Sequence, residues 1–291
     1  LTYRYAHLIK TYGINFENVL AITFTNKAAN EMKDRISDLL NLELSPKWIS
    51  TFHSLCVKML RIHGHLIGFN NNFTIYDQSD STKLVRNCMR DSDIDTKQYS
   101  PKRIQAHISS LKNQRILPGE AVEFAQSFFD VKVAEIYSSY QKKLMLANSM
   151  DFDDLLIKAV ELLETSDKSL NYWSSKFQYI MIDEYQDTNM VQYRLVELLA
   201  SKHKNICVVG DSDQSIYAFR GADIRNIEEF ESDFKNAKVI SLEKNYRSSQ
   251  KILDIANAVI SNNPRKKDKK LWTDNDEGLD VNLVEFNSER D

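Results

Sequence analysis

Three short apolar runs, at residues 19–24, 179–182 and 206–209, each lead into a polar turn and then into a segment whose apolar residues recur at helical spacing. Strand, loop and helix repeated in this order are typical of a parallel sheet covered by helices. Ligands of such sheets bind at the carboxyl ends of the strands. The pattern therefore predicts an α/β fold, with its functional residues directly after the apolar runs.

Between residues 77 and 150 the pattern changes to helices alone, and no strand-like run interrupts it. We interpret this stretch as a helical subdomain inserted into the α/β domain. At its end, acidic residues precede an apolar helix at residues 155–163, and capping of that helix is favoured over a metal site. These acids are Asp151, Asp153 and Asp154.

Composition limits the class of protein. With 291 residues, 33.8 kDa and 42% hydrophobic residues, the chain has room for about two domains. No apolar run of roughly 18 residues and no secretory leader is present, which favours a cytoplasmic protein over a membrane protein. The net charge of −3 means that any nucleic-acid groove must be local. The three cysteines are interpreted as buried, reduced thiols, namely Cys56, Cys88 and Cys207.

Two adjacent acids, Asp183 and Glu184, follow the second apolar run. Such a pair can cap the next helix, but acids at the tip of a buried strand also suit Mg²⁺ and nucleotide chemistry. Asp183 is then the candidate metal ligand, and Glu184 the residue that activates water. After the third run, Gln214 is placed to bond both a water and a phosphate oxygen.

Aromatic residues alternate in the segment after Gln214, where Tyr217 and Phe219 are followed by Arg220. Aromatic rings in a polar loop that contains glycine suit stacking on bases, which is indifferent to nucleotide sequence. The alternative is that Phe219 anchors the loop in the core. Residues alone leave these two readings open.

The first apolar run ends in Phe24, Thr25 and Asn26, a set that suits a nucleic-acid backbone with one stacked base. Thr51 and His53, before another helix, offer a second set of side chains for the nucleic-acid backbone, although a single histidine is more often structural.

Nearer the carboxyl end, a strand-like run at residues 239–242 precedes Tyr246 and Arg247. Arg247 could reach a γ-phosphate, and Tyr246 could stack on adenine. A second strand-like run covers residues 281–286. The basic residues between 265 and 270 form a solvated face or, less favoured, a phosphate contact.

Five stretches occur in order: ITFTNKAANEM from Ile22, ISTFHS from Ile49, IDEYQDT from Ile182, VVGDSDQSIYAFRGAD from Val208 and LEKNYRS from Leu242. With them the chain closely resembles the UvrD/PcrA/Rep-like superfamily 1 DNA helicases. The resemblance implies an ATP-driven enzyme that moves 3′ to 5′ on single-stranded DNA, in DNA repair or replication. It also implies a RecA-like domain 1A at residues 1–76 and 151–240, an inserted subdomain 1B at 77–150, and the start of domain 2A at 241–291.

The resemblance also implies residue roles. Asp183 would hold Mg²⁺ and Glu184 would activate water, while Gln214, Tyr246 and Arg247 would contact ATP. The implied DNA partners are single strands and their junctions with duplex, together with possible repair or replication proteins. The implied DNA track is lined by Phe24, Thr25, Asn26, Thr51, His53, Tyr217, Phe219 and Arg220.

Two departures from the family pattern carry expectations of their own. Phe219 stands where close relatives have Trp, and a smaller ring should stack more weakly. The family's phosphate loop is expected upstream of Leu1, so this stretch by itself is expected to bind ATP poorly. A non-hydrolysing module that grips single-stranded DNA is the main alternative, and a metal nuclease using Asp183 and Glu184 is a weaker one.

Overall fold

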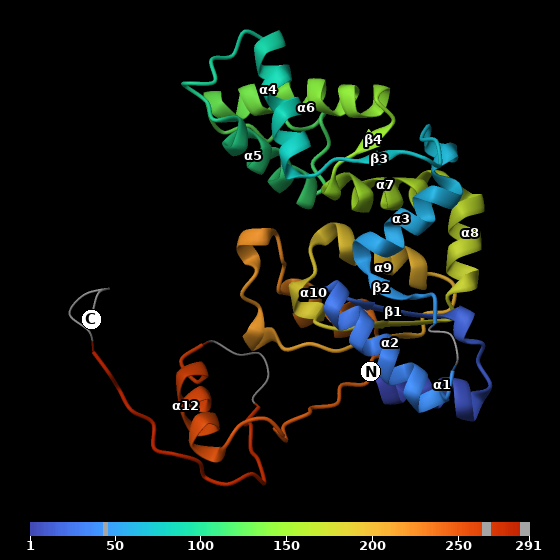
Figure 1. The fold of residues 1–291 in the computed structure, drawn as a ribbon, viewed down its shortest axis with the longest axis vertical. Coiled ribbons are helices and arrows are strands. Elements are labelled where there is room, and N and C mark those ends of the chain that lie inside the picture. Colours follow the sequence, from blue (N-terminus) through green and yellow to red (C-terminus); the bar gives the residue numbers. More distant parts are fainter. Residues whose placement is uncertain (43–45, 264–268, 286–291) are drawn as a thin grey trace. The chain divides into compact units, whose positions relative to one another are not determined.

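The computed structural model describes residues 1–42, 46–263 and 269–285 (Figure 1). The chain divides into two compact units, Leu1–Ile227 and Glu228–Asp291. None of the described helices is both long enough and apolar enough to cross a membrane.

A four-stranded parallel sheet forms the centre of the first unit, in the order β2-β1-β5-β6. Parallel pairing confirms the predicted α/β fold. The first and third predicted strands end one residue early, before Phe24 and Val209. The strands are β1 (Val19–Thr23), β2 (Ile49–Thr51), β5 (Tyr179–Ile182) and β6 (Ile206–Val208).

Helices cover both faces of this sheet (Figure 1). Along β1, Val19 and Ala21 face α1 (Thr2–Tyr12) and α2 (Asn26–Leu40), and share a buried core with Tyr5, Met32 and Ile36. Because side chains alternate along a strand, Leu20 and Ile22 point to the opposite face and are equally buried. That face carries α3 (Phe52–His63), α7 (Phe152–Thr165), α8 (Asp167–Lys176) and α9 (Met190–Ala200). Two short 3₁₀ helices, Phe16–Asn18 and Gly64–Ile67, lie before β1 and after α3.

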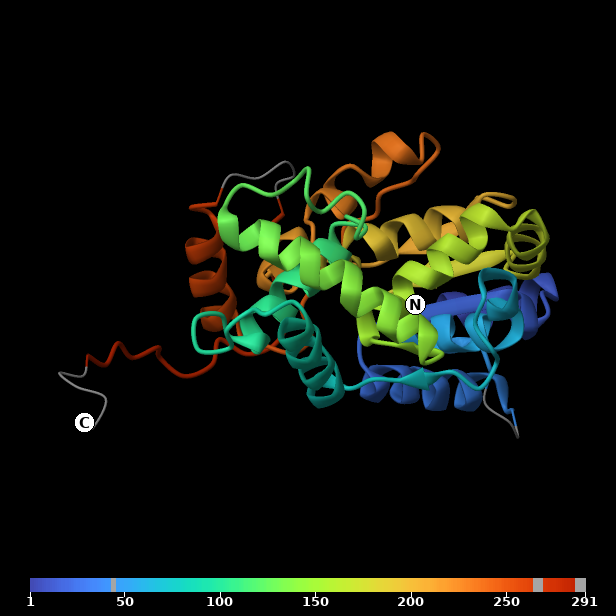
Figure 2. The ribbon, with the colours of Figure 1, turned by 90° about the horizontal axis from the view of Figure 1, so that it is seen from above.

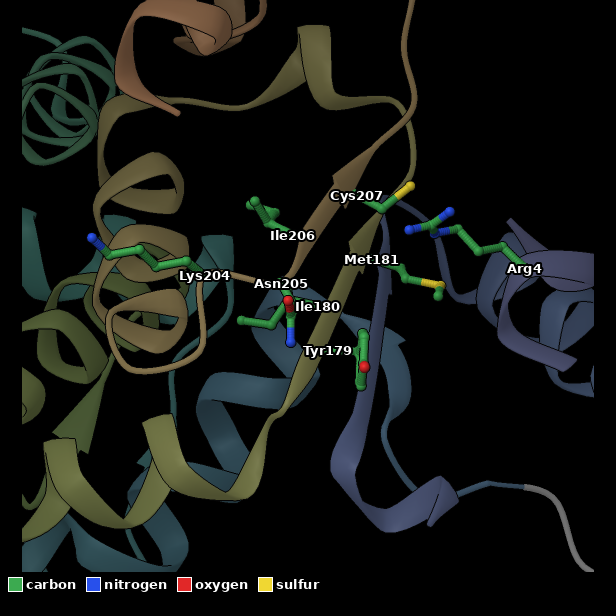
Figure 3. Close-up of a pocket in the computed structure, with 8 residues that line it drawn as sticks. All are labelled: Arg4, Tyr179, Ile180, Met181, Lys204, Asn205, Ile206 and Cys207. Carbon is green, nitrogen blue, oxygen red and sulfur yellow. The ribbon is translucent and has the colours of Figure 1, made fainter. Parts of the chain in front are cut away.

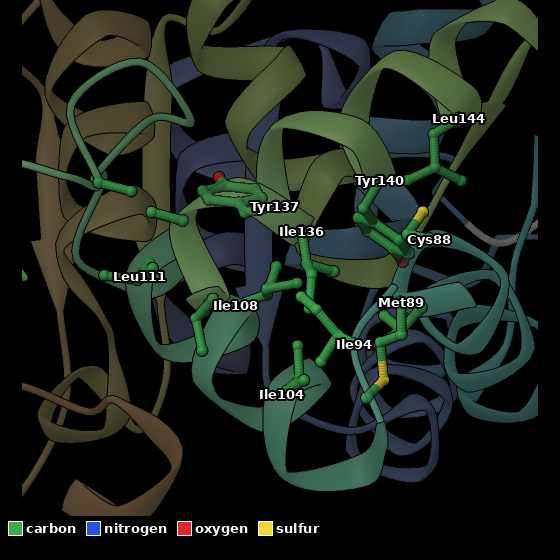
Figure 4. Close-up of a cluster of buried hydrophobic side chains, with 14 of the residues drawn as sticks. Cys88, Met89, Ile94, Ile104, Ile108, Leu111, Ile136, Tyr137, Tyr140 and Leu144 are labelled. Carbon is green, nitrogen blue, oxygen red and sulfur yellow. The ribbon is translucent and has the colours of Figure 1, made fainter. Parts of the chain in front are cut away.

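Three helices between residues 78 and 146 form a group with a hydrophobic core of its own (Figures 2 and 4). We call this group the helical segment; its members are α4 (Gln78–Asp91), α5 (Pro101–Asn113) and α6 (Phe128–Leu146). The expectation of helices alone up to residue 150 is wrong at its end. There β4 (Ser149–Met150) pairs in parallel with β3 (Thr74–Ile75), because the chain leaves and re-enters the α/β part at adjacent points.

Asp151 caps α7 as predicted. Its carboxylate accepts a hydrogen bond of 2.8 Å from the backbone of Asp154, and the Asp154 carboxylate accepts one from the Asp151 backbone. The structure also places a lysine side chain beside these carboxylates, which the sequence pattern did not predict. Lys112, at the end of α5, is fully buried and lies 2.7 Å from each of these two carboxylates. One buried ion cluster thus joins the helical segment to α7.

The second unit contains α11 (Phe230–Asp233), α12 (Gln250–Ile260) and an isolated bridge between Lys244 and Trp272. The short helix α10 (Arg225–Glu228) spans the boundary between the two units. Strands predicted at residues 239–242 and 281–286 are wrong for every described residue of those runs, since none of them forms a strand. A lone apolar run cannot satisfy its backbone groups without a neighbouring strand. Phe286 lies outside the described residues.

Cys56 and Cys88 are buried free thiols, as predicted. Cys207 is also a free thiol, but it is only partly buried, which corrects the prediction for that residue. The reason is its position in β6, which has a single neighbour in the described sheet.

Candidate nucleotide and nucleic-acid site

The carboxyl ends of the four strands meet at one edge of the sheet. Thr23 is in register with Thr51, and Ile182 with both Ile22 and Val208. This register brings the residues that follow each strand side by side. Sequence-predicted site residues of the first unit therefore gather at one edge, as the parallel pattern required.

Asp183 and Glu184 extend from the tip of β5. The Asp183 backbone still donates to the carbonyl of Ile22, at 2.9 Å, whereas Glu184 takes a left-handed conformation with φ 52° and is exposed. Burial, and then the charge of Glu184, raise the pKa of Asp183 above its ordinary value. Neither carboxylate forms a salt bridge with a side chain in the described part of the chain. A cation placed here would relieve this unfavourable pairing of charges.

Gln186 is a site residue that sequence reasoning missed. Its side chain is 2% exposed, donates to the Glu184 carboxylate at 2.9 Å, and accepts from the backbone of Asp211 at 3.0 Å. The Gln186 carbonyl also accepts from the Ser215 hydroxyl at 3.3 Å. Gln186 thus ties the acidic pair to the loop that follows β6. The available signal was a polar amide inside a buried stretch, which must find partners.

Gly210 lets this contact form. A methyl group at Gly210 would lie 2.5 Å from Oε1 of Gln186 and 2.9 Å from Cδ1 of Ile227. Any side chain here would push the loop away from Gln186, so the requirement for glycine is steric.

We call residues 210–223 the aromatic loop. It contains two 3₁₀ turns, Ser212–Gln214 and Ala218–Arg220. In the first turn, the exposed Gln214 side chain donates to the Asp211 carboxylate at 2.8 Å. At the far end, the Asp223 backbone donates to the Thr188 carbonyl at 2.9 Å. Both ends of the loop are therefore held by the segment that follows the acidic pair.

Phe219 is 77% exposed and Tyr217 37% exposed, with their ring centroids 5.9 Å apart. The reading in which Phe219 anchors the loop in the core is therefore wrong. Exposed neighbouring rings are suited to stacking on unpaired bases. The side chain of Arg220 lies outside what the structure describes.

Some of the residues after β1 and β2 that were predicted to contact DNA cap the helices that begin there. The Thr25 hydroxyl accepts from the Ala28 backbone at 3.1 Å and caps α2, while Asn26 beside it is exposed. Thr51 caps α3 in the same way and is 7% exposed. Phe24 is only partly buried and meets the buried ring of Phe52 edge to face, 6.0 Å between centroids.

His53 contacts Phe152, a second residue that sequence reasoning missed. Their ring centroids lie 5.4 Å apart, and Phe152 is 56% exposed at the start of α7. Burial lowers the pKa of His53, so a neutral imidazole faces this surface at neutral pH. Only the fold brings residues 53 and 152 together, which is why neither position stood out as part of a pair.

Tyr246 and Arg247 belong to the second unit, and both are exposed. The Asn245 side chain accepts from the backbones of Arg247 and Ser248, at 2.8 and 2.7 Å, and so shapes the turn that presents them. The Lys244 ammonium lies 5.3 Å from the Tyr246 ring centroid. Within the basic run, residues 265–268 lie outside the described residues.

A pocket near the amino ends of β5 and β6 contains none of the predicted site residues (Figure 3). It is lined by Arg4 of α1 and by residues 179–181 and 204–207.

Among the described residues, no group of three or more His, Cys, Asp and Glu side chains could hold a metal ion. Asp183 and Glu184 could therefore supply only part of a metal's ligands, with other oxygens completing the shell.

Comparison with known proteins gives matches along the whole chain. The profile of the UvrD/REP helicase N-terminal domain matches residues 1–235, and that of the UvrD-like helicase C-terminal domain matches residues 240–291. The ATP-dependent DNA helicase PcrA of Staphylococcus aureus (strain NCTC 8325 / PS 47) is 48% identical over 291 residues, 100% of this chain and 40% of the relative. PcrA of Bacillus subtilis (strain 168) is 47% identical over 289 residues, 99% of this chain and 39% of the relative. The chain thus spans about 40% of the length of these relatives.

Proposed function

We propose that this chain, which belongs to the UvrD/REP helicase family, forms part of a motor that uses ATP to move 3′ to 5′ along single-stranded DNA. The relatives named above are ATP-dependent DNA helicases, and this chain covers about 40% of them. The motor would serve DNA repair or replication in the bacterial cytoplasm, with junctions between single and double strands among its substrates.

One observation carries the proposal. Gln186 contacts the Glu184 carboxylate and two points of the aromatic loop, so nucleotide-facing and base-facing residues belong to one bonded assembly. Tyr217 and Phe219 are exposed on that same loop. A structural change at Glu184 on nucleotide binding can therefore be transmitted to the stacking rings through a few covalent and hydrogen bonds.

The acidic pair fits a magnesium nucleotide, because the partly buried Asp183 carboxylate and the exposed Glu184 carboxylate both lack a cationic side-chain partner in the described chain. Asp183 would hold Mg²⁺, which when bound withdraws charge from the phosphates. Glu184 would orient and deprotonate the attacking water, with its carboxylate held by Gln186. Gln214, Tyr246 and Arg247 are proposed to contact ATP.

The DNA track would combine the stacking rings with donors at the neighbouring strand ends. Exposed Asn26 and the neutral imidazole of His53 suit phosphate and sugar contacts. Thr25 and Thr51 would contribute less than the sequence indicates, since their hydroxyls already accept backbone hydrogen bonds. The remaining members of the proposed track are Phe24, Tyr217, Phe219 and Arg220.

We also propose a domain arrangement. A RecA-like domain 1A would comprise residues 1–76 and 151–240, with subdomain 1B at 77–150 and the start of domain 2A at 241–291. Two observations support it: the helical segment has its own core, and the C-terminal-domain profile begins at residue 240.

The test is DNA-stimulated ATP hydrolysis by the complete gene product that contains these residues. Glu184→Gln should lower turnover by about 10²–10⁴-fold, the usual contribution of a general base, while single-stranded DNA binding is retained. Glu197→Gln is a matched control, because this exposed carboxylate pairs with Arg194 on α9. Turnover of Glu184→Gln equal to that of the control would refute the catalytic assignment.

A non-hydrolysing module that grips single-stranded DNA is the second candidate, favoured by the exposure of the Tyr217 and Phe219 rings. It predicts tight binding of oligothymidylate by the complete gene product and no hydrolysis of ATP with or without DNA. DNA-stimulated hydrolysis excludes it.

A further inference from the structure

The last turn of α5 lies where the helical segment meets the α/β part of the first unit. Lys112 fixes this turn, because its buried ammonium bonds to Asp151 and Asp154 at the start of α7. The next residue, Asn113, is partly buried and is therefore held at a defined position.

The Asn113 side chain contacts its own helix and two other parts of the chain. Its amide nitrogen donates to the carbonyl of Ser109, one turn back in α5, at 2.8 Å, and approaches the Asp153 carboxylate of α7 at 3.4 Å. Its amide oxygen accepts from the Asn189 side chain at 2.6 Å. Asn189 caps α9, accepting from the Gln192 backbone at 2.9 Å. Donor and acceptor of one amide thus join α5, α7 and α9.

The aromatic loop passes directly against the same side chain. A methyl group at Gly221 would lie 3.1 Å from Cβ of Asn113, so the loop backbone is in close contact there. Gly221 has a φ of +87° and ends the 3₁₀ turn that carries Phe219, with its N–H donating to the Ala218 carbonyl at 2.9 Å. Residues with side chains rarely adopt this conformation, which makes the contact specific to glycine.

We propose that Asn113 is a positioning residue, which fixes the Gly221 end of the aromatic loop so that Tyr217 and Phe219 are held ready to stack on single-stranded DNA. Gln186 holds the other end of the loop beside Glu184. The inference rests on the proposed function. It adds a second point at which the aromatic loop is held, and this point lies on the helical segment.

Three variants of the complete gene product test this, in assays of ATP turnover against oligothymidylate concentration. Asn113→Ala keeps the Cβ atom but removes the amide group that lies against Gly221 and bonds to Asn189. It should raise the half-stimulating DNA concentration about three- to tenfold, an effect of the size of one net hydrogen bond. Asn189→Ser should do the same, because serine retains the helix cap but removes the donor to Asn113. Gln114→Ala is the matched control, since the side chain of this exposed neighbour donates to Ser110 within α5.

A loss of folded protein would lower the maximal rate and leave the half-stimulating DNA concentration unchanged, so these two readouts separate positioning from stability. Combining Asn113→Ala with Phe219→Ala should raise that concentration by less than the product of the single effects, because both act through the same stack.

The outcomes are distinct. If wild-type turnover is not stimulated by DNA, the proposed function fails, and the positioning role with it. If wild type is stimulated but both Asn113→Ala and Asn189→Ser match Gln114→Ala, the positioning role alone is overturned. Effects that multiply fully in the double variant would overturn it as well.

Discussion

Replacing Lys112 by Met tests the buried ion cluster that joins the helical segment to α7. In the native protein the Lys112 ammonium is fully buried and lies 2.7 Å from Asp151 and from Asp154. The Tyr140 hydroxyl also donates to Asp151, at 2.8 Å. Methionine is unbranched like lysine and one heavy atom shorter, and it leaves two carboxylates without a cation.

Removing one partner of a buried ion pair costs about 3–5 kcal/mol. At roughly 2–4 °C per kcal/mol for a unit of this size, the melting temperature should fall by about 6–20 °C. Lys132→Met is the control, since its pair with Glu135 on α6 is partly exposed and worth about 0–1 kcal/mol. Restoring neutrality with Asp154→Asn in the Lys112→Met background should recover part of the loss.

The loss should also depend on pH. Burial raises the pKa of Asp154 to about 6 from its ordinary 3.8, even though the Lys112 ammonium opposes this shift. A carboxyl whose pKa is raised by folding destabilises the native state increasingly as pH rises through that interval. Without Lys112 the pKa rises further, so the deficit should be larger at pH 8 than at pH 5.5. Calorimetric melts at both pH values measure it, and a deficit below about 1 kcal/mol at pH 8 would refute the reasoning.

Three further substitutions follow from the site. Phe219→Ala should weaken oligothymidylate binding about 5- to 150-fold, because one stacked base contributes about 1–3 kcal/mol. Anisotropy titrations measure this affinity, and Phe219→Trp should bind at least as tightly as wild type. Unchanged affinity of the alanine variant would show that Phe219 is not part of the DNA track. Gly210→Ala should lower DNA-stimulated turnover at least about tenfold, because the added methyl group would lie 2.5 Å from Oε1 of Gln186. Gly119→Ala is the control and should leave turnover unchanged, because a methyl group there would have no atom within 4 Å. Equal rates for the two variants would contradict this prediction. Burial lowers the pKa of His53 below its ordinary 6.5, so the folded state binds its proton less readily and stability falls as pH drops below that value. His53→Gln should reduce this fall in melts between about pH 7.5 and 5.5, and parallel curves would argue against a buried neutral imidazole.

Three of the four strands could be predicted from sequence because β1, β5 and β6 read as continuous apolar runs, whereas β2 has two polar residues among its three. Tyr179–Ile182 was predicted to the residue, since it combines an apolar run with acids directly after it. Apolar runs at 239–242 and 281–286 look similar in isolation, yet no described residue in either forms a strand. A strand requires a neighbour as well as its own composition.

The placement of candidate site residues was predictable where it depends on the end of a strand, as for Asp183 and Glu184 after β5. It was not predictable where the role depends on contacts between distant residues. Asn113 meets Asn189 and Gly221 only in the folded chain, and His53 meets Phe152 in the same way. Gln186 lies between these cases, because its segment was recognised but its two partners were not.

We propose that the aromatic loop couples nucleotide binding to DNA binding. The most direct measurement is the Kd of oligothymidylate for the complete gene product carrying Glu184→Gln, with and without saturating Mg-ATP. Coupling of this kind typically amounts to about 5–150-fold, and ATP affinity must change by the same factor when DNA is added. We predict such a reciprocal shift, and its loss when Gln214→Ala is added. Identical Kd values with and without Mg-ATP would contradict the claim.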